Sequence, residues 1–209
     1  MNMNYIGYEE MKERILSTEG FDSIEVTDNT ISLYDAKDNR FLNYRNLDTV
    51  NLREVFNFNS FDLDKDKFFN IVNLLDKNMF MIVDEIVFIN SEKELDVLLE
   101  KYDTQYMDIE KAIGINFFND NVIVINSYLL KKIVHEDCED DDCLCPKEEL
   151  SRGIWQTLIH ELRHNIVANP IITEDEIAIE EADEDLIEEY CISIYEDIIC
   201  KYEDRYCFN

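Results

Sequence analysis

The sequence contains few of the two residue types that most often interrupt helices and strands, with four glycines and two prolines in 209 residues. Its turns must therefore rely on Asn and Asp, and we expect long helices to carry much of the fold. Hydrophobic residues make up 46% of the chain and aromatic residues 11%. That content excludes a disordered tail protein and is enough for one sizeable core or two small subdomains.

Basic residues are also scarce. Lys and Arg total 19 against 48 Asp and Glu, which gives a formal net charge of −29 at pH 7. Such a charge repels phosphate backbones and anionic lipid, so we expect no nucleic-acid partner and no membrane partner. No hydrophobic run approaches the ~18 to 20 residues that span a bilayer, and the polar segment from Met1 to Leu16 lacks the pattern of an export signal. We therefore expect a cytoplasmic protein whose six cysteines are reduced thiols.

Hydrophobic periodicity and turn residues predict an α+β fold. A capping box of Ser91 and Glu94 opens one of the expected helices. The helices are expected at 8–16, 63–76, 91–102, 146–169 and 173–202. The strands are expected at 23–27, 30–34, 41–44 and 80–90, with a hairpin of 113–118 and 121–125. We divide the chain into an N-terminal lobe of helix plus β-meander, residues 1–78, and a core domain, residues 79–209.

The acidic segment 135–145 contains three of the cysteines and separates the hairpin from the last two helices. Cys138, Cys143 and Cys145 could ligate a metal ion such as zinc together with His135, in addition to any other metal site of the chain. Their C-x4-C-x-C spacing is not that of a familiar zinc finger, and the surrounding carboxylates disfavour a tight thiolate site. We therefore predict an exposed loop here.

Only three histidines occur in the chain, and two of them lie in the sequence His160-Glu161-Leu162-Arg163-His164, an H-E-x-x-H motif. Residues four apart on a helix lie on one face about one turn apart, so both imidazoles can reach a single tetrahedral Zn²⁺. Glu161 would lie beside that ion, where it can take a proton from a metal-activated water and later deliver it to a leaving amine. The motif therefore indicates peptide hydrolysis with Zn²⁺ as cofactor, unless the two histidines are ordinary residues of a helix surface.

The expected motif helix is bracketed by the two prolines of the chain, Pro146 and Pro170. On a helical wheel, small residues share the histidine face and leave it clear, apolar residues form a core face, and long polar residues form a solvent face. The cleared face contains Gly153, Thr157 and Ala168, the core face Ile154, Trp155, Leu158, Ile159, Leu162 and Ile166, and the solvent face Arg152, Gln156 and Arg163.

A third protein ligand is required, and the last helix offers six glutamates, namely Glu174, Glu176, Glu180, Glu181, Glu184 and Glu188. Here the sequence resembles the gluzincin branch of the zincin metallopeptidases, in which a glutamate within an E-x-x-x-D pattern follows H-E-x-x-H on the next long helix. The segment from Glu181 to Asp185 matches that pattern. The resemblance implies that Glu181 is the third ligand and that Asp185 orients a metal-binding histidine. The interval after the motif is slightly shorter than in thermolysin-like enzymes, so Glu184 and Glu180 stay open as alternatives.

The order of strand, capped helix, hairpin and H-E-x-x-H helix also resembles the zincin domain, over roughly residues 80 to 200. The resemblance implies a mixed sheet whose edge strand pairs with a peptide substrate by main-chain hydrogen bonds. The segment 112–118 is the candidate edge strand, with Ile113, Gly114 and Ile115 as substrate-binding residues and Gly114 allowing close backbone approach. The alternative is an internal core strand with a bulge at Gly114.

The sequence thus predicts a zinc-dependent metalloendopeptidase that acts on a protein or peptide substrate. His160, His164 and Glu181 would bind the metal, with Glu161 as general base and acid. A rival interpretation is an acidic binding or decoy protein, which uses its charge to occupy a basic partner and keeps a structural or vestigial zinc site. A second rival is a processing protease that cleaves a single target.

Overall fold

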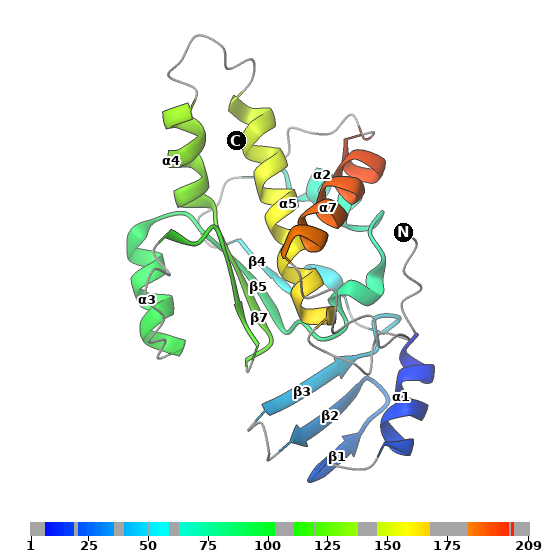
Figure 1. Cartoon of the computed structure of the whole chain (residues 1–209). Coiled ribbons are helices and arrows are strands. Elements are labelled where there is room, and N and C mark those ends of the chain that lie inside the picture. The colour runs from blue at the N-terminus through cyan, green and yellow to red at the C-terminus, as the bar shows by residue number, and fades with distance from the viewer. Residues whose placement is uncertain are drawn as a thin grey trace.

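The computed structural model describes residues 7–18, 21–35, 40–49, 51–58, 63–102, 111–118, 120–137, 146–167, 184–200 and 202. The described chain is a mixed α+β structure with two separate sheets (Figure 1). No helix among these residues is both long enough and apolar enough to cross a membrane.

The N-terminal part is a helix packed on a three-stranded antiparallel sheet, as predicted. The helix buries Tyr8, Met11 and Ile15, whose spacing of three and four residues makes one apolar stripe. That stripe packs in the hydrophobic core with residues of the second and third strands. The elements are α1 (Tyr8–Ser17), β1 (Ser23–Val26), β2 (Thr30–Asp35) and β3 (Arg40–Arg45), and the strand order is β1-β2-β3.

The second sheet is mixed and has four strands in the order β4-β5-β7-β6. The first three strands of that order run parallel, and β6 runs antiparallel to β7 in the predicted hairpin. Asn121, in the connection between them, takes a left-handed backbone conformation with φ 54°. Asn tolerates this conformation better than most residues, which suits a chain poor in glycine. The strands are β4 (Phe56–Asn57), β5 (Glu85–Ile89), β6 (Gly114–Phe117) and β7 (Val122–Asn126).

Helices cover both faces of this sheet. Along β5, Ile86 and Phe88 join the large core on one face, whereas Val87 and Ile89 join a smaller core on the other. The smaller core is closed by α3 (Glu92–Tyr102). At its start Ser91 Oγ accepts from the N–H of Glu94, as the capping box predicts, whereas the Glu94 carboxylate accepts from the N–H of Asn90, one residue before Ser91. The large core is closed by α2 (Lys65–Val72), α4 (Ser127–Asp137) and α5 (Pro146–Val167).

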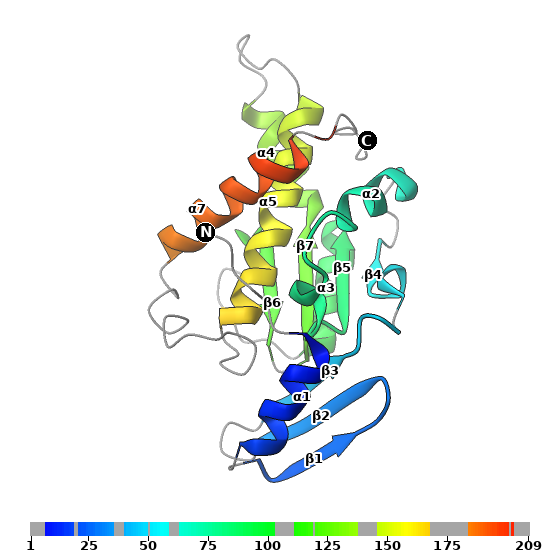
Figure 2. The ribbon, with the colours of Figure 1, turned by 90° about the vertical axis from the view of Figure 1, so that its right-hand side faces the viewer.

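The long helix α5 lies between the sheet and the C-terminal helix. It contacts β6 and β7 on one side and α7 (Glu184–Ile194) on the other. Figure 2 shows α7 crossing α5. A π-helical turn, η4 (Tyr195–Ile199), extends α7. This arrangement holds the H-E-x-x-H helix on both sides.

The two sheets are joined at Asp84, just before β5. Its carboxylate accepts hydrogen bonds from Arg45 at 2.7 Å, Asn121 at 3.2 Å and Asn43 at 3.4 Å. Arg45 and Asn43 belong to β3, whereas Asn121 belongs to the β6–β7 hairpin. A single carboxylate therefore ties the N-terminal sheet to the second sheet.

Part of the expected N-terminal lobe belongs to the second sheet. Residues 56–57 form β4 beside β5, and Phe68 of α2 stacks on Trp155 of α5 with ring centroids 4.7 Å apart. One continuous hydrophobic core contains both Tyr8 and Trp155. The boundary at residue 78 stays a prediction.

Three local predictions were wrong in extent. The strand expected at 80–90 begins only at Glu85, because the 3₁₀ turn η2 (Lys77–Phe80) and the turn after it take up the expected start of the strand. Another 3₁₀ turn, η1 (Leu52–Glu54), precedes β4. The helix expected at 63–76 is limited to α2. Helix α4 was not predicted, and it extends through His135, which was assigned to a loop. The cysteines of that segment lie outside the described residues.

Candidate metal centre

Helix α5 presents the motif near its C-terminal end. Pro146 is its first residue, where a missing N–H costs no helical hydrogen bond. The predicted core face is buried at Ile154, Trp155, Leu158, Ile159 and Leu162. This packing fixes the rotation of α5 and therefore the direction in which the motif side chains project.

The two histidines converge. The Nε2 atoms of His160 and His164 lie 2.8 Å apart, and both rings are half-buried. The ring centroids are 4.5 Å apart with an interplanar angle of 77°. Two nitrogens at about 2.0–2.1 Å from a tetrahedral Zn²⁺ are about 3.3 Å apart, so a separation of the rings by about 0.5 Å would admit the ion. The two imidazole nitrogens are therefore close enough for one zinc ion to bind both after a small separation.

Glu161 lies against strand β6. Its side chain is buried, with 7% of the residue exposed. A Cβ atom placed on Gly114 would lie 2.2 Å from Oε1 of Glu161 and 2.7 Å from Cγ2 of Thr157. Only glycine therefore leaves room for the carboxylate in this position.

Asn116, two residues along β6, makes the second contact with this helix turn. Its Nδ2 donates a hydrogen bond to the backbone carbonyl of Glu161 at 3.0 Å. Asn116 was not among the predicted site residues. The strand period of two places it on the same face as Gly114, and that signal could have found it.

Strand β6 forms an edge of the described sheet, because it pairs with β7 alone. The register runs through Gly114 opposite Ile125 without interruption, so the bulge of the alternative interpretation is absent from the described strand. The N–H of Asn126 donates to the carbonyl of Ile113, directly opposite, at 2.7 Å. Such bonded pairs alternate with non-bonded pairs in an antiparallel ladder, so the backbone groups of Gly114 and Asn116 point to the free edge.

The third ligand cannot be located among the described residues. Glu181 and Glu180 lie outside them, as do the side chains of Glu184 and Asp185, whose backbones begin α7. Glu188 is described and exposed. Within the described ranges no group of three or more metal-binding side chains is assembled.

Two predictions for α5 were wrong. Arg163, expected in solvent, is only 3% exposed, and its guanidinium lies 4.9 Å from the ring centroid of Tyr190 on α7. The helical wheel could not show this because the covering helix is remote in sequence. Gly153, expected on the cleared face, instead packs against Leu130 of α4.

Helix α7 also places a thiol near the motif. Cys191 is buried, and burial raises the pKa of its thiol to about 12, with the negative charge of Glu161 adding to the rise and the positive charge of Arg163 opposing it. A thiol in this state is neutral and a poor metal ligand or nucleophile. Cys191 therefore serves helix packing in the hydrophobic core.

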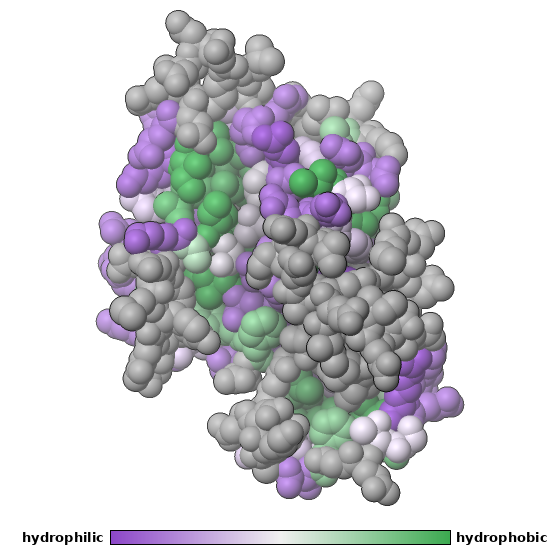
Figure 3. All heavy atoms as spheres, viewed as in Figure 1, coloured by the Kyte–Doolittle hydropathy of each residue, from purple (hydrophilic) through white to green (hydrophobic). Residues whose placement is uncertain are grey.

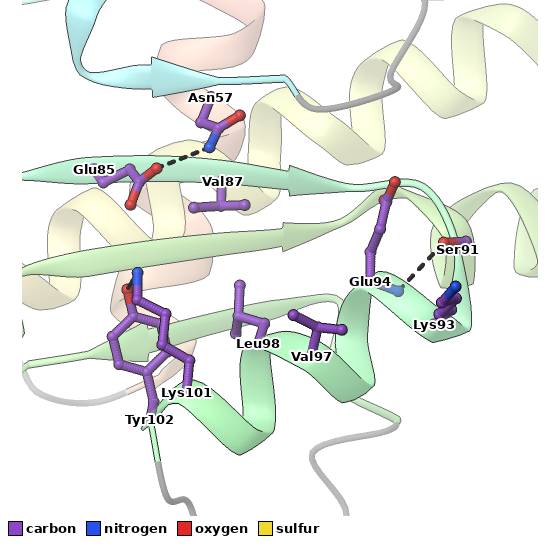
Figure 4. Close-up of a pocket in the computed structure, with 10 residues that line it drawn as sticks. All are labelled: Asn57, Glu85, Val87, Ser91, Lys93, Glu94, Val97, Leu98, Lys101 and Tyr102. Atoms are coloured by element: carbon purple, nitrogen blue, oxygen red, sulfur yellow. Dashed lines mark hydrogen bonds between the residues drawn. The ribbon is translucent and has the colours of Figure 1, made fainter.

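A groove of about 580 Å³ lies on the opposite face of the sheet, between α3 and strands β4 and β5 (Figure 4). Its floor includes Val87 and Leu98, and its carboxylates are engaged in hydrogen bonds. Glu85 accepts from Asn57 at 2.9 Å, and Glu94 accepts from the backbone of Asn90 at 2.7 Å. Because the groove lies on the face of the sheet opposite α5, it is separate from the motif.

Comparison of the chain with protein-family models, curated proteins and solved structures finds no match.

Proposed function

We propose that this protein is a zinc-dependent metalloendopeptidase with a zincin-like core. The observation that carries the proposal is the proximity of His160 and His164 on α5, with the buried carboxylate of Glu161 packed against Gly114 of β6. A surface helix that binds no ligand would gain nothing from this arrangement. Burying the Glu161 carboxylate costs free energy, because the charge loses its hydration.

The metal would be held by His160, His164 and a carboxylate from the segment before or at the start of α7, with Glu181 as the first candidate. Zinc bound there would polarise the amide carbonyl and lower the pKa of an attacking water. Glu161 would take the proton from that water and pass it to the leaving amine. Asp185 is proposed to accept the other N–H of a ligand histidine.

The substrate is proposed to be an extended peptide that pairs with β6. The outward backbone groups of Gly114 and Asn116 would bond it, and these residues also contact Glu161. A scissile amide on that added strand would pass close to the Glu161 carboxylate. Because the protein carries a charge of −29, we expect basic peptides to be preferred.

The test is metal analysis of the purified protein together with cleavage of internally quenched peptides, one set rich in lysine and one rich in glutamate. We expect close to one zinc per chain, and we expect His160→Ala to lose it. Glu161→Gln should retain zinc and lose cleavage. His135→Ala is the matched control, because it removes the third histidine of the chain, exposed on α4.

Two results would overturn the proposal. One is full cleavage by Glu161→Gln, because the proton transfer would then not involve this carboxylate. The other is a protein that takes up no zinc and binds a basic partner in a way that 1 M salt abolishes and chelators do not affect. That result would support the acidic binding protein instead.

A further inference from the structure

Strand β1 of the N-terminal sheet has an open edge. In the described part of the chain it pairs with β2 on one side and with no strand on the other. All four of its residues, Ser23–Val26, are exposed. It contains neither proline nor lysine, the residues that commonly protect such an edge from pairing.

The register of the sheet shows which backbone groups face outward. The N–H of Thr27 donates to the carbonyl of Thr30, directly opposite, at 2.8 Å. Bonded and non-bonded pairs alternate along β1 and β2, so the N–H and C=O groups of Ile24 and Val26 point away from β2. Four backbone groups are thus available to an added strand.

The same two residues supply an apolar strip. Ile24 and Val26 are each 38% exposed, and they lie opposite the buried Leu33 and Ile31 on the face that α1 covers. Leu16, near the end of α1, is 58% exposed. Figure 3 shows hydrophobic atoms at the surface in the region of the N-terminal sheet, beside the hydrophilic surface of α1. Side chains of an added strand that point to the α1 face would extend this strip.

The surroundings of β1 are acidic. The sequence has no Lys or Arg between Arg14 and Lys37. Asp22, Glu25 and Asp28 lie on or beside β1, and all three are exposed. An added strand with the same charge would be repelled, which disfavours a second copy of this chain.

We propose that β1 is a docking edge for an extended basic segment of a partner protein, which adds a fourth strand to the N-terminal sheet. Main-chain hydrogen bonds to Ile24 and Val26 would hold the segment, and alternate apolar side chains would cover the exposed strip. Basic side chains between them would face the carboxylates around β1. The proposal does not depend on the metal centre.

The probe for this edge is a ten-residue peptide of alternating valine and lysine with blocked ends. Amide hydrogen exchange of the whole protein should show that the peptide slows exchange at Ile24 and Val26 by at least about tenfold. Ser23 and Glu25, which face β2, should change little. Protection at Gly114 and Asn116 in place of β1 would overturn the proposal, because the peptide would then be using the β6 edge.

A proline variant separates pairing from charge attraction. Ile24→Pro removes an outward N–H and leaves the bonds to β2, a position where an edge strand accepts proline. It should weaken peptide binding by at least about tenfold, since it removes one hydrogen bond and blocks a neighbouring strand. Ile24→Ala keeps the N–H and is the control. Val26→Pro repeats the test if the first variant unfolds.

Unchanged affinity in the proline variants would overturn the proposal. Equally tight binding of a control peptide with proline in place of alternate valines would do the same. Both results would show that the acidic surface attracts lysine without forming a strand.

Discussion

Replacement of Gly114 by alanine tests the contact between β6 and the catalytic candidate. The new Cβ would lie 2.2 Å from Oε1 and 2.9 Å from Cδ of Glu161. A comfortable carbon–oxygen contact needs about 3.2 Å, so the carboxylate must move by about 1 Å. A misplacement of this size in a reacting group can cost about 10²-fold in rate. We therefore expect kcat/KM to fall by about 10²-fold while zinc affinity stays within about twofold.

The assay combines steady-state cleavage of a lysine-rich quenched peptide with zinc titration against a chromogenic chelator. The control is Gly153→Ala, on the same helix as the motif. It places a Cβ 2.9 Å from the side chain of Leu130, away from Glu161, so it should alter thermal stability without changing kcat/KM. A double-mutant cycle with Glu161→Asp adds a sharper measure, because the shorter acid withdraws from the new methyl group.

We expect Gly114→Ala to lower kcat/KM much less in the Glu161→Asp background than in the parent. Strictly additive effects in this cycle would show that the methyl group acts elsewhere, for example by shifting the whole strand. Full activity of Gly114→Ala would refute the inferred position of the carboxylate. Loss of zinc in this variant would also contradict it, because the three atoms nearest the new Cβ belong to Glu161 and Thr157 and not to the two histidines.

Two other predictions concern stability. Asp84→Ala should lower the free energy of unfolding by about 2 kcal/mol and the Tm by about 4–8 °C, because three donors from two sheets lose their acceptor. The control is Asp66→Ala, which breaks an exposed ion pair with Arg53 and should change the Tm little. An equal fall in Tm in both variants would contradict the inference that Asp84 joins the two sheets. The pKa of the Cys191 thiol is about 12 in the folded protein and about 9 in the unfolded chain. The folded state therefore holds the proton more tightly, and its contribution to the free energy of unfolding is full below about pH 9 and is lost as pH rises toward 12. The parent should therefore lose up to about 1.4 kcal/mol per pH unit more than Cys191→Ala in that range by urea titration, and identical pH profiles would show that the thiol is not buried.

The sequence was informative where one periodic pattern decides the structure. The hairpin and α5 were predicted because strand alternation and helical spacing are both strong there, and a proline begins α5. Helix α4 was not predicted, and it follows β7 without an intervening turn. The signal for its start was Asn126, whose Oδ1 accepts a hydrogen bond from the N–H of Leu129 at 3.0 Å.

Contacts between remote elements could not be predicted in this way. The wheel placed Arg163 in solvent, yet α7 covers it through Tyr190. The same wheel placed Gly153 beside the histidines, yet α4 fills that space with Leu130. Both errors arise because a helical wheel describes one helix and contains no information about which neighbour covers each face. This error affects the H-E-x-x-H motif less, because the relative positions of its three side chains depend only on their spacing along one helix.

The charge of the chain bears on its two open strand edges. The described parts of β1 and β6 each present unpaired backbone groups along one side, and such edges commonly lead to association between copies. A net charge of −29 opposes that association, since any two copies repel each other before their edges meet. The repulsion acts over about 8 Å at physiological salt and does not act against a basic chain. The excess of acid can therefore keep both edges free of a second copy while leaving them open to extended basic segments, at β6 for the proposed cleavage and at β1 for the proposed docking.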